Sequence, residues 1–419
     1  MTTPTSTPTA QSSSDPTPGA SPGAASATAA EARPARTGPL DGIRVLDLTS
    51  VVLGPLATQV LADFGADVIK IEGPEGDLMR ANGVSLHPGM SSIFIALNRN
   101  KRSVVLDLKR AEDAAALRRL IQGADVLVHN MRVAAIERLG FGYAAVRALN
   151  PRIVYCAATG FGQDGPDRDR PAFDDIIQAA CGLASVNSQG REDTDYVASL
   201  IADKTTGLAV SNAVLAALLH RERHGEGQAV EVPMLETMAA FTLAEHMGGL
   251  TFPGSTAKAG YARLLGGGRR PARTRDGWIG LLPYTARHWE AFFRVAGRED
   301  LCARYDVADR QARNRDIQAL YGHLLEILAT RDTDEWLALC DELDIPATRI
   351  YTLDELPEHP QLRAVALFQD SMHPTEGALR ELRPTTRFDL TPTSIRRPAP
   401  TLGQHTAEVL AEPGIQERP

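Results

Sequence analysis

Apolar residues recur at two different spacings along the chain from residue 43 onward. Short, nearly continuous apolar runs such as IRVLDL at 43–48 are typical of strands that are buried on both faces. Longer stretches such as GPLATQVLADFGA at 54–66 place apolar residues every three or four positions, which indicates helices. The pattern predicts strands at 43–48, 67–72, 103–109, 125–130 and 152–160, with helices at 54–66 and 111–124.

This alternation of strands and helices predicts a fold of the α/β class. Each helix of about a dozen residues would connect two neighbouring strands in a βαβ unit. The strands would then run parallel, and the helices would cover both faces of the sheet. No repeat with a period of about 20–50 residues is visible.

The pattern changes after Gly225. Segments with strand or helix periodicity then follow at 229–234, 277–284, 288–297, 314–331 and 332–345. They predict a second, smaller α/β domain at residues 226–350. The stretch 391–412 combines a Pro-rich extended segment with a final short helix.

Residues 1–37 consist mainly of Ser, Thr, Pro and Ala and contain no large apolar residue after Met1. Such a segment cannot bury enough apolar surface to offset the conformational entropy that folding would cost. We therefore expect residues 1–37 to be a disordered tail and the fold to begin at residue 38.

The charge balance narrows the range of partners. The chain has 44 Lys and Arg residues against 52 Asp and Glu residues, a formal net charge of −8. An acidic chain without a basic cluster is a poor candidate for binding nucleic acid or an anionic membrane. No apolar run reaches the length of a transmembrane helix. The four cysteines are far apart and form no CxxC pair, which argues against a zinc site and a disulfide framework and favours a cytoplasmic location.

Several common catalytic and nucleotide-binding motifs are missing from the sequence. No GxGxxG follows the first predicted strand, so the usual signature of dinucleotide binding is lost. No GxxxxGK[ST], GxSxG or HExxH motif occurs either. Phosphate-loop NTPases, α/β-hydrolases and zinc proteases are therefore not indicated.

Three cations lie at the ends of predicted strands: Lys109 is the last residue of the third strand, and Arg132 and Arg138 follow the fourth. In an open α/β sheet, ligands bind beyond the carboxyl ends of the strands. Backbone N–H groups at helix starts, together with Arg and Lys side chains, form anion sites there. The same three cations would also fit an ordinary solvated surface, so the pattern leaves both interpretations open.

Asp203 stands between two apolar runs, at the start of a long helical pattern. One interpretation is an N-cap, a position that favours Asp. The other is a nucleophile, because the helix dipole and backbone donors would hold the carboxylate ionised. An ionised carboxylate can attack an acyl group and form an acyl-enzyme.

Longer motifs occur in one order along the chain: PLDGIRVLDLTSVVLGPLATQVLADFGADVIKIEGPEGDLMR, NRNKRSVVLDLK, ADVLVHNMRVAAIERLG, NPRIVYCAATGFGQDGP, ADKTTGLAVSNAVLAALLHRERHGEGQAVEVPMLE and LGQHTAEVL. Together they resemble the class III CoA-transferases of the CaiB/BaiF type. This family includes formyl-CoA transferase, carnitine CoA-transferase and α-methylacyl-CoA racemase. The resemblance covers residues 39–411.

The resemblance implies an interlocked homodimer of two ring-like chains. Each chain would have a large Rossmann-like domain and a smaller α/β domain. The large domain would take both ends of the chain, residues 38–225 and 351–419, and the small domain would take residues 226–350.

The resemblance also implies site residues. The nucleophilic aspartate of the family matches Asp203. The positions that match its CoA contacts are Val52, Leu53, Leu106, Asp107, Leu108, Lys109, Asn130, Met131, Arg132 and Arg138. An acyl-CoA and a small carboxylic acid would be the substrates, with no tightly bound cofactor and no metal.

The implied reaction moves CoA from an acyl-CoA to a carboxylic acid through an aspartyl anhydride and an aspartyl–CoA thioester. One departure favours transfer over racemisation: the racemases have a His where this chain has Phe173, and a racemase needs an acid/base on each face of the substrate. An acyl-CoA racemase, a CoA-thioester hydrolase and a non-catalytic acyl-CoA-binding protein are the alternatives.

The sequence does not identify the acid substrate. Four arginines near a GGG stretch could bind the second carboxylate of a dicarboxylic acid: Arg263, Arg269, Arg270 and Arg273. A solvated loop would explain the same residues.

Overall fold

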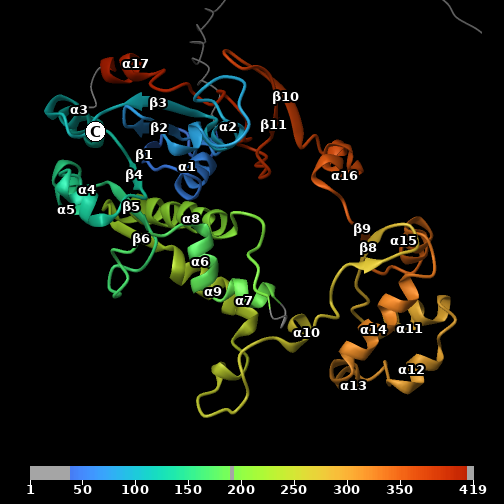
Figure 1. The fold of residues 1–419 in the computed structure, drawn as a ribbon. Coiled ribbons are helices and arrows are strands. Elements are labelled where there is room, and N and C mark those ends of the chain that lie inside the picture. Colours follow the sequence, from blue (N-terminus) through green and yellow to red (C-terminus); the bar gives the residue numbers. More distant parts are fainter. Residues whose placement is uncertain (1–37, 189–192, 413–419) are drawn as a thin grey trace, which may run out of the picture. The chain divides into compact units, whose positions relative to one another are not determined.

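The computed structural model describes residues 38–188 and 193–412 (Figure 1). The expected tail at residues 1–37 lies outside the described residues and stays a prediction.

The largest sheet has six strands in the order β3-β2-β1-β4-β5-β6. Its strands are β1 Arg44–Leu48, β2 Asp67–Glu72, β3 Lys101–Val105, β4 Val126–His129, β5 Val154–Thr159 and β6 Ala229–Pro233. All five neighbouring pairs are parallel, so every strand ends at the same edge of the sheet. The predicted α/β class and parallel sheet are confirmed.

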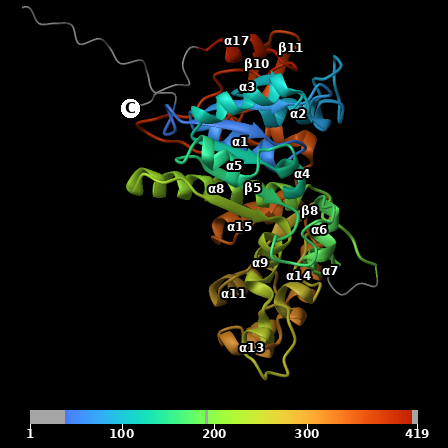
Figure 2. The same ribbon diagram turned by 90° about the vertical axis from the view of Figure 1, so that its left-hand side faces the viewer.

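Helices cover both faces of this sheet (Figures 1 and 2). One face packs against α1 Leu53–Asp63, α6 Asp174–Ala180, α8 Ile201–His224 and α9 Met234–His246. The other packs against α3 Ala111–Gln122, α4 Val133–Arg138, α5 Tyr143–Leu149 and α17 Thr406–Ala411. Adjacent residues such as Val45 and Leu46 enter opposite cores, which explains why the strands read as continuous apolar runs.

Two expectations about the sheet are corrected. The third strand was expected at 103–109, but β3 ends at Val105, because Asp107 and Lys109 form a turn in which Asp107 Oδ1 accepts the N–H of Lys109 (3.1 Å). The segment 229–234 was expected in the second domain. Instead β6 pairs with β5 and completes the large sheet, so this sheet extends past Gly225.

A second region has its own sheet and its own core. Its antiparallel sheet consists of β7 Ala272–Arg273, β8 Trp278–Leu281 and β9 Ala347–Arg349. Five helices lie between β8 and β9 in the chain: α11 Ala286–Val295, α12 Asp300–Arg304, α13 Arg310–Arg315, α14 Ile317–Leu328 and α15 Thr333–Glu342. Large aromatic side chains such as Trp289, Phe293 and Trp336 fill this core. The division of the chain into a large and a small domain stays a prediction.

The C-terminal segment contacts the edge strand β3. The N–H of Val105 donates to Thr406 Oγ1 (3.0 Å), and the N–H of His405 donates to the carbonyl of Ser103 (2.9 Å). The C-terminal segment therefore lies beside β3, at the edge of the large sheet.

The remaining elements connect these parts. They are the helices α2 Ser92–Asn98, α7 Leu183–Asn187, α10 Ala262–Leu265 and α16 Pro360–Ala364, the 3₁₀ turns η1 Leu78–Arg80, η2 Gly248–Thr251 and η3 Leu353–Glu358, and the hairpin β10 Phe368–His373 with β11 Gly377–Leu382.

Candidate active site

A cavity of about 280 Å³ lies at the carboxyl ends of β1, β4 and β5. Its lining residues are Ser50, Val51, Leu53, Leu78, Asn130, Met131, Arg132, Val133, Ala158, Thr159, Gly160, Gln163, Arg168, Arg170, Pro171, Ala172, Phe173, Asp203 and Met234. The strand order reverses between β1 and β4, and such a switch point is where open α/β sheets bind ligands.

Asp203 enters this cavity from the first turn of α8. The helix begins after Leu200, so Asp203 is the third helical residue, and the N-cap interpretation is wrong. Asp203 is buried, with 8% of its surface exposed. Its N–H donates to Asp174 Oδ2 (2.9 Å), and Gln178 Nε2 donates to Asp174 Oδ1 (2.6 Å).

The surroundings of Asp203 disfavour its charge. Burial, followed by the negative charges of Asp174 and Asp175, raises the pKa of Asp203 to about 7. The helix start was expected to favour the ionised form, but the pKa is shifted in the opposite direction. Burial and two like charges outweigh the helix start, so the protonated form of Asp203 is favoured relative to an ordinary carboxyl group.

Four of the expected CoA-contacting residues line the cavity with Asp203: Leu53, Asn130, Met131 and Arg132. Asn130 also shapes the wall. Its Oδ1 accepts the N–H of Ser50 (3.0 Å), and its Nδ2 donates to the carbonyl of Ser50 (2.8 Å). The segment after β4 is thereby tied to the turn after β1.

The other expected contacts do not line this cavity. Val52 is buried as the N-cap of α1, and Leu106 is buried in the core beside α3. Lys109 and Arg138 are exposed. Asp107 and Leu108 are not among the lining residues either. A CoA-binding role for these six residues stays a prediction.

Two arginines in the cavity lining were missed by the sequence analysis. Arg168 and Arg170 belong to the segment that follows β5, so the rule about strand ends could have identified them. Each makes an exposed ion pair, Arg168 with Asp169 (3.5 Å) and Arg170 with Asp167 (3.2 Å).

The four arginines near the GGG stretch are not among the residues that line this cavity. Arg263 Nε instead donates to the hydroxyl of Tyr321 (3.0 Å), and the Arg273 guanidinium lies over the ring of Trp278.

Phe173 also lines the cavity, directly before α6. A phenyl ring can neither donate nor accept the α-proton of an acyl group. In the part of the chain that the structure describes, Asp203 is the only carboxylic acid in the cavity lining.

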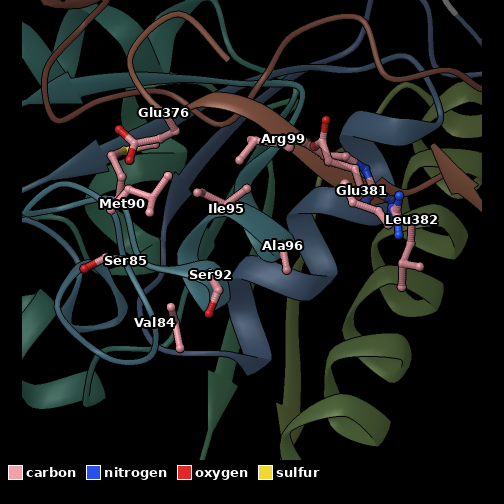
Figure 3. A pocket seen from close by; sticks show the side chains of 13 residues that line it. Val84, Ser85, Met90, Ser92, Ile95, Ala96, Arg99, Glu376, Glu381 and Leu382 are labelled. Carbon is pink, nitrogen blue, oxygen red and sulfur yellow. The ribbon is translucent and has the colours of Figure 1, made fainter. Parts of the chain in front are cut away.

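A second cavity, of about 290 Å³, lies between residues 84–99 and the strand β11 (Figure 3). Apolar side chains such as Met90 and Ile95 form most of its wall. Its charged groups already have partners: Arg99 pairs with Asp63 (2.6 Å). None of the expected site residues lines it.

No group of three or more His, Cys, Asp or Glu side chains in residues 38–188 and 193–412 is arranged to hold a metal ion. Within the same described ranges, no helix is both long and apolar enough to cross a bilayer.

Comparison with known proteins identifies the family. The model of CoA-transferase family III matches residues 40–406. A succinate–glutarate CoA-transferase of Agrobacterium fabrum is 34% identical over 408 residues, which cover 92% of this chain and 98% of that protein. A formyl-CoA:oxalate CoA-transferase of Rhodopseudomonas palustris is 31% identical over 403 residues, which cover 90% of this chain and 93% of that protein.

The fold agrees with these matches. A crystal structure of Rv3272 from Mycobacterium tuberculosis superposes with a TM-score of 0.78 at 30% identity, covering 89% of this chain and 99% of that chain. Both the family match and the relatives extend over most of the sequence. The chain therefore belongs to CoA-transferase family III and is a CoA-transferase.

Proposed function

We propose that this enzyme moves CoA from an acyl-CoA thioester to a carboxylic acid by covalent catalysis at Asp203. The observation that carries the proposal is the position of Asp203, a buried acid at the switch point of a parallel sheet and the only acid in the described lining of the cavity. A nucleophile in such a site is oriented and shielded from bulk water.

The reaction would begin when an Asp203 carboxylate oxygen attacks the thioester carbonyl carbon. The C–S bond breaks, the CoA thiolate leaves, and a mixed anhydride forms. The thiolate then attacks Cγ of Asp203 and releases the first carboxylate, which leaves an aspartyl–CoA thioester. The acceptor carboxylate repeats these two steps in reverse, so that Asp203 is regenerated and a new acyl-CoA leaves.

Each attack places negative charge on a carbonyl oxygen. The first N–H groups of a helix have no intrahelical partner and stabilise such charge. The α1 helix begins at Leu53, in the wall of the same cavity, so its start is the proposed oxyanion site. Arg132, Asn130 and Met131 would hold the CoA moiety.

The acid substrate is proposed to be a dicarboxylic acid. The two relatives described above carry the names of dicarboxylates: succinate, glutarate and oxalate. Arg168 and Arg170 line the cavity, and their guanidinium groups would bind the carboxylate that does not react.

Replacing Asp203 tests the chemistry. Asp203→Ala should lose transfer activity by about a thousandfold or more, because the covalent route needs the carboxylate. With the unchanged enzyme, incubation with acyl-CoA and no acceptor followed by hydroxylamine should give a hydroxamate on Asp203, detected by peptide mass spectrometry. A label on Asp174 or Asp175 instead, or full turnover by Asp203→Ala, would refute the proposal.

Replacing the two arginines tests the substrate class. Arg168→Gln and Arg170→Gln should each raise KM for dicarboxylic acceptors by about tenfold and leave KM for monocarboxylic acceptors unchanged. Arg270→Gln, an exposed arginine outside the cavity lining, is the matched control. Equal effects on both acceptor classes would contradict the dicarboxylate assignment.

The racemase alternative is not favoured, since the relatives described above are named as transferases and Phe173 supplies no acid or base. The interlocked homodimer, the cytoplasmic location and the lack of a tightly bound cofactor stay predictions.

A further inference from the structure

The turn between β1 and α1 contains a strained residue. Val51 has a φ of 74°, in the left-handed region. A β-branched residue in this region is rare because its side chain collides with the backbone. Such a conformation persists only where the surroundings enforce it, and it is concentrated at functional sites. Val51 lines the cavity that contains Asp203.

Asp77 holds this strained residue from the side of the following loop. Its Oδ1 accepts the N–H of Val51 (3.0 Å) and also the N–H of Met79 (2.9 Å), which caps the η1 turn. Asp77 is 4% exposed, and its side chain does not appear in the cavity lining. It therefore acts on the site only through the backbone that it binds.

Lys70 fixes the other end of the same turn. Its Nζ donates to the carbonyl of Thr49 (2.8 Å) and lies 2.8 Å from Asp77 Oδ2. Both side chains of this ion pair are fully buried. Asp47 Oδ1 accepts the N–H of Thr49 (3.0 Å), so the start of the turn is held from two sides.

The close packing of α1 leaves the turn little room to relax. A Cβ atom at Gly54 would lie 2.2 Å from Thr49 Cβ. A Cβ atom at Gly207 would lie 2.6 Å from the carbonyl oxygen of Leu53. Thr49 therefore packs against Gly54 on one side, and Gly207 of α8 packs against Leu53 on the other. The helix α8 also carries Asp203.

We propose that Asp77, oriented by Lys70, is a positioning residue that holds Val51 in the left-handed conformation and so aims the start of α1 at the acyl group on Asp203. This inference rests on the proposed function. Neither Asp77 nor Lys70 touches the substrate. They stabilise a left-handed backbone conformation that Val51 would not adopt without these contacts.

A double-mutant cycle between Asp77 and Val51 tests the proposal. Glycine adopts positive φ freely, so Val51→Gly removes the need for the Asp77 anchor. Asp77→Ala alone should lower kcat by about 30-fold or more, with KM for acyl-CoA changed by less than about threefold. In the Val51→Gly background, Asp77→Ala should lower kcat by less than about fivefold. A residue needed only for folding would show no such selective rescue.

Glu75→Ala removes a neighbouring exposed acid and is the matched control, expected to leave kcat unchanged. Thermal melting of every variant accompanies the kinetics. If Asp77→Ala does not fold, the same cycle is run with Asp77→Leu, which keeps a side chain of similar shape but removes the oxygen that accepts the Val51 N–H.

Equal kcat losses from the Asp77 substitution in both backgrounds, or no loss in either, would overturn this inference. Failure of the proposed function is a separate result, because it would appear as turnover by Asp203→Ala. An inactive Asp203→Ala together with an uncoupled Asp77–Val51 cycle would reject the positioning role and leave the nucleophile in place.

Discussion

The carboxyl group of Asp203 lies where its charged form is disfavoured, yet the proposed reaction uses the charged form. Burial and the neighbouring acids Asp174 and Asp175 raise its pKa to about 7. A raised pKa makes a carboxylate more nucleophilic and reduces the fraction that is ionised at neutral pH.

The pKa of Asp203 predicts how activity depends on pH. Since only the carboxylate attacks, kcat/KM should fall as the pH drops through about 7. Asp174→Asn removes one negative neighbour and should move the midpoint to lower pH by about half a unit or more. The measurement is kcat/KM between about pH 5 and 9. An unchanged midpoint in Asp174→Asn would show that Asp174 does not act on this carboxyl group.

The same pKa predicts a stability effect. Because the folded-state pKa lies above the ordinary value of 3.8, folded protein binds the extra proton between about pH 4 and 7, and stability falls as the pH rises through that window. Asp203→Asn should therefore be more stable than the parent at pH 8, by about 1–3 kcal/mol, and similar to it near pH 4. Denaturant unfolding at both pH values measures this, with the exposed Asp164→Asn as a control that should show no gain.

At the scale of elements, the site depends on how closely α1 and α8 approach. Gly207 lies inside α8, where a Cβ atom would come within 2.6 Å of the Leu53 carbonyl. A larger residue there would push the start of α1 away from Asp203.

Gly207→Ala should lower stability by about 1–3 kcal/mol and reduce kcat, although alanine is the better helix former. Gly322 in α14 is the matched control, since a Cβ atom there would have no atom within 4 Å apart from its chain neighbours and the backbone of its own helix. Gly322→Ala should raise stability by about 0.5–1 kcal/mol. A gain in stability from both substitutions would mean that α8 can move away from α1 without cost.

At the scale of the whole molecule, a buried cation joins the C-terminal segment to the sheet. Arg102 on β3 is 4% exposed. It pairs with Asp67 on β2 (2.7 Å) and Glu408 on α17 (3.1 Å), and it also contacts Glu412.

Arg102→Ala should destabilise the protein by about 1–3 kcal/mol. The substitution removes the buried cation that Asp67, Glu408 and Glu412 share and leaves these acids close to one another. Arg110→Ala removes an exposed pair with Glu112 and should change stability by less than about 0.5 kcal/mol. Urea unfolding of both variants measures the difference. A small effect of Arg102→Ala would mean that apolar packing of α17 alone holds the C-terminal segment.

The local apolar pattern predicted the strands of the large sheet well, because strands buried on both faces have a strong local signal. It also indicated a strand at 229–234, but it missed the partner of β6. That strand pairs with β5 across 69 residues of intervening chain, and the partners include Tyr155 and Ala229. The choice of a partner strand is a non-local property, and the exposed and half-buried residues of β6 carry no local mark of it.

The sequence by itself determined the α/β class, the family resemblance and the place of Asp203 at the start of a helix, since these depend on local spacing and on motifs. Only the tertiary structure decided the rest of the site. It assembled Arg168 and Arg170 with Asp203, set three acids close enough to raise a pKa, and bound the Val51 backbone to Asp77. Those properties arise from distances between residues far apart in the chain, and electrostatic coupling and packing depend on distance in space rather than on order in sequence.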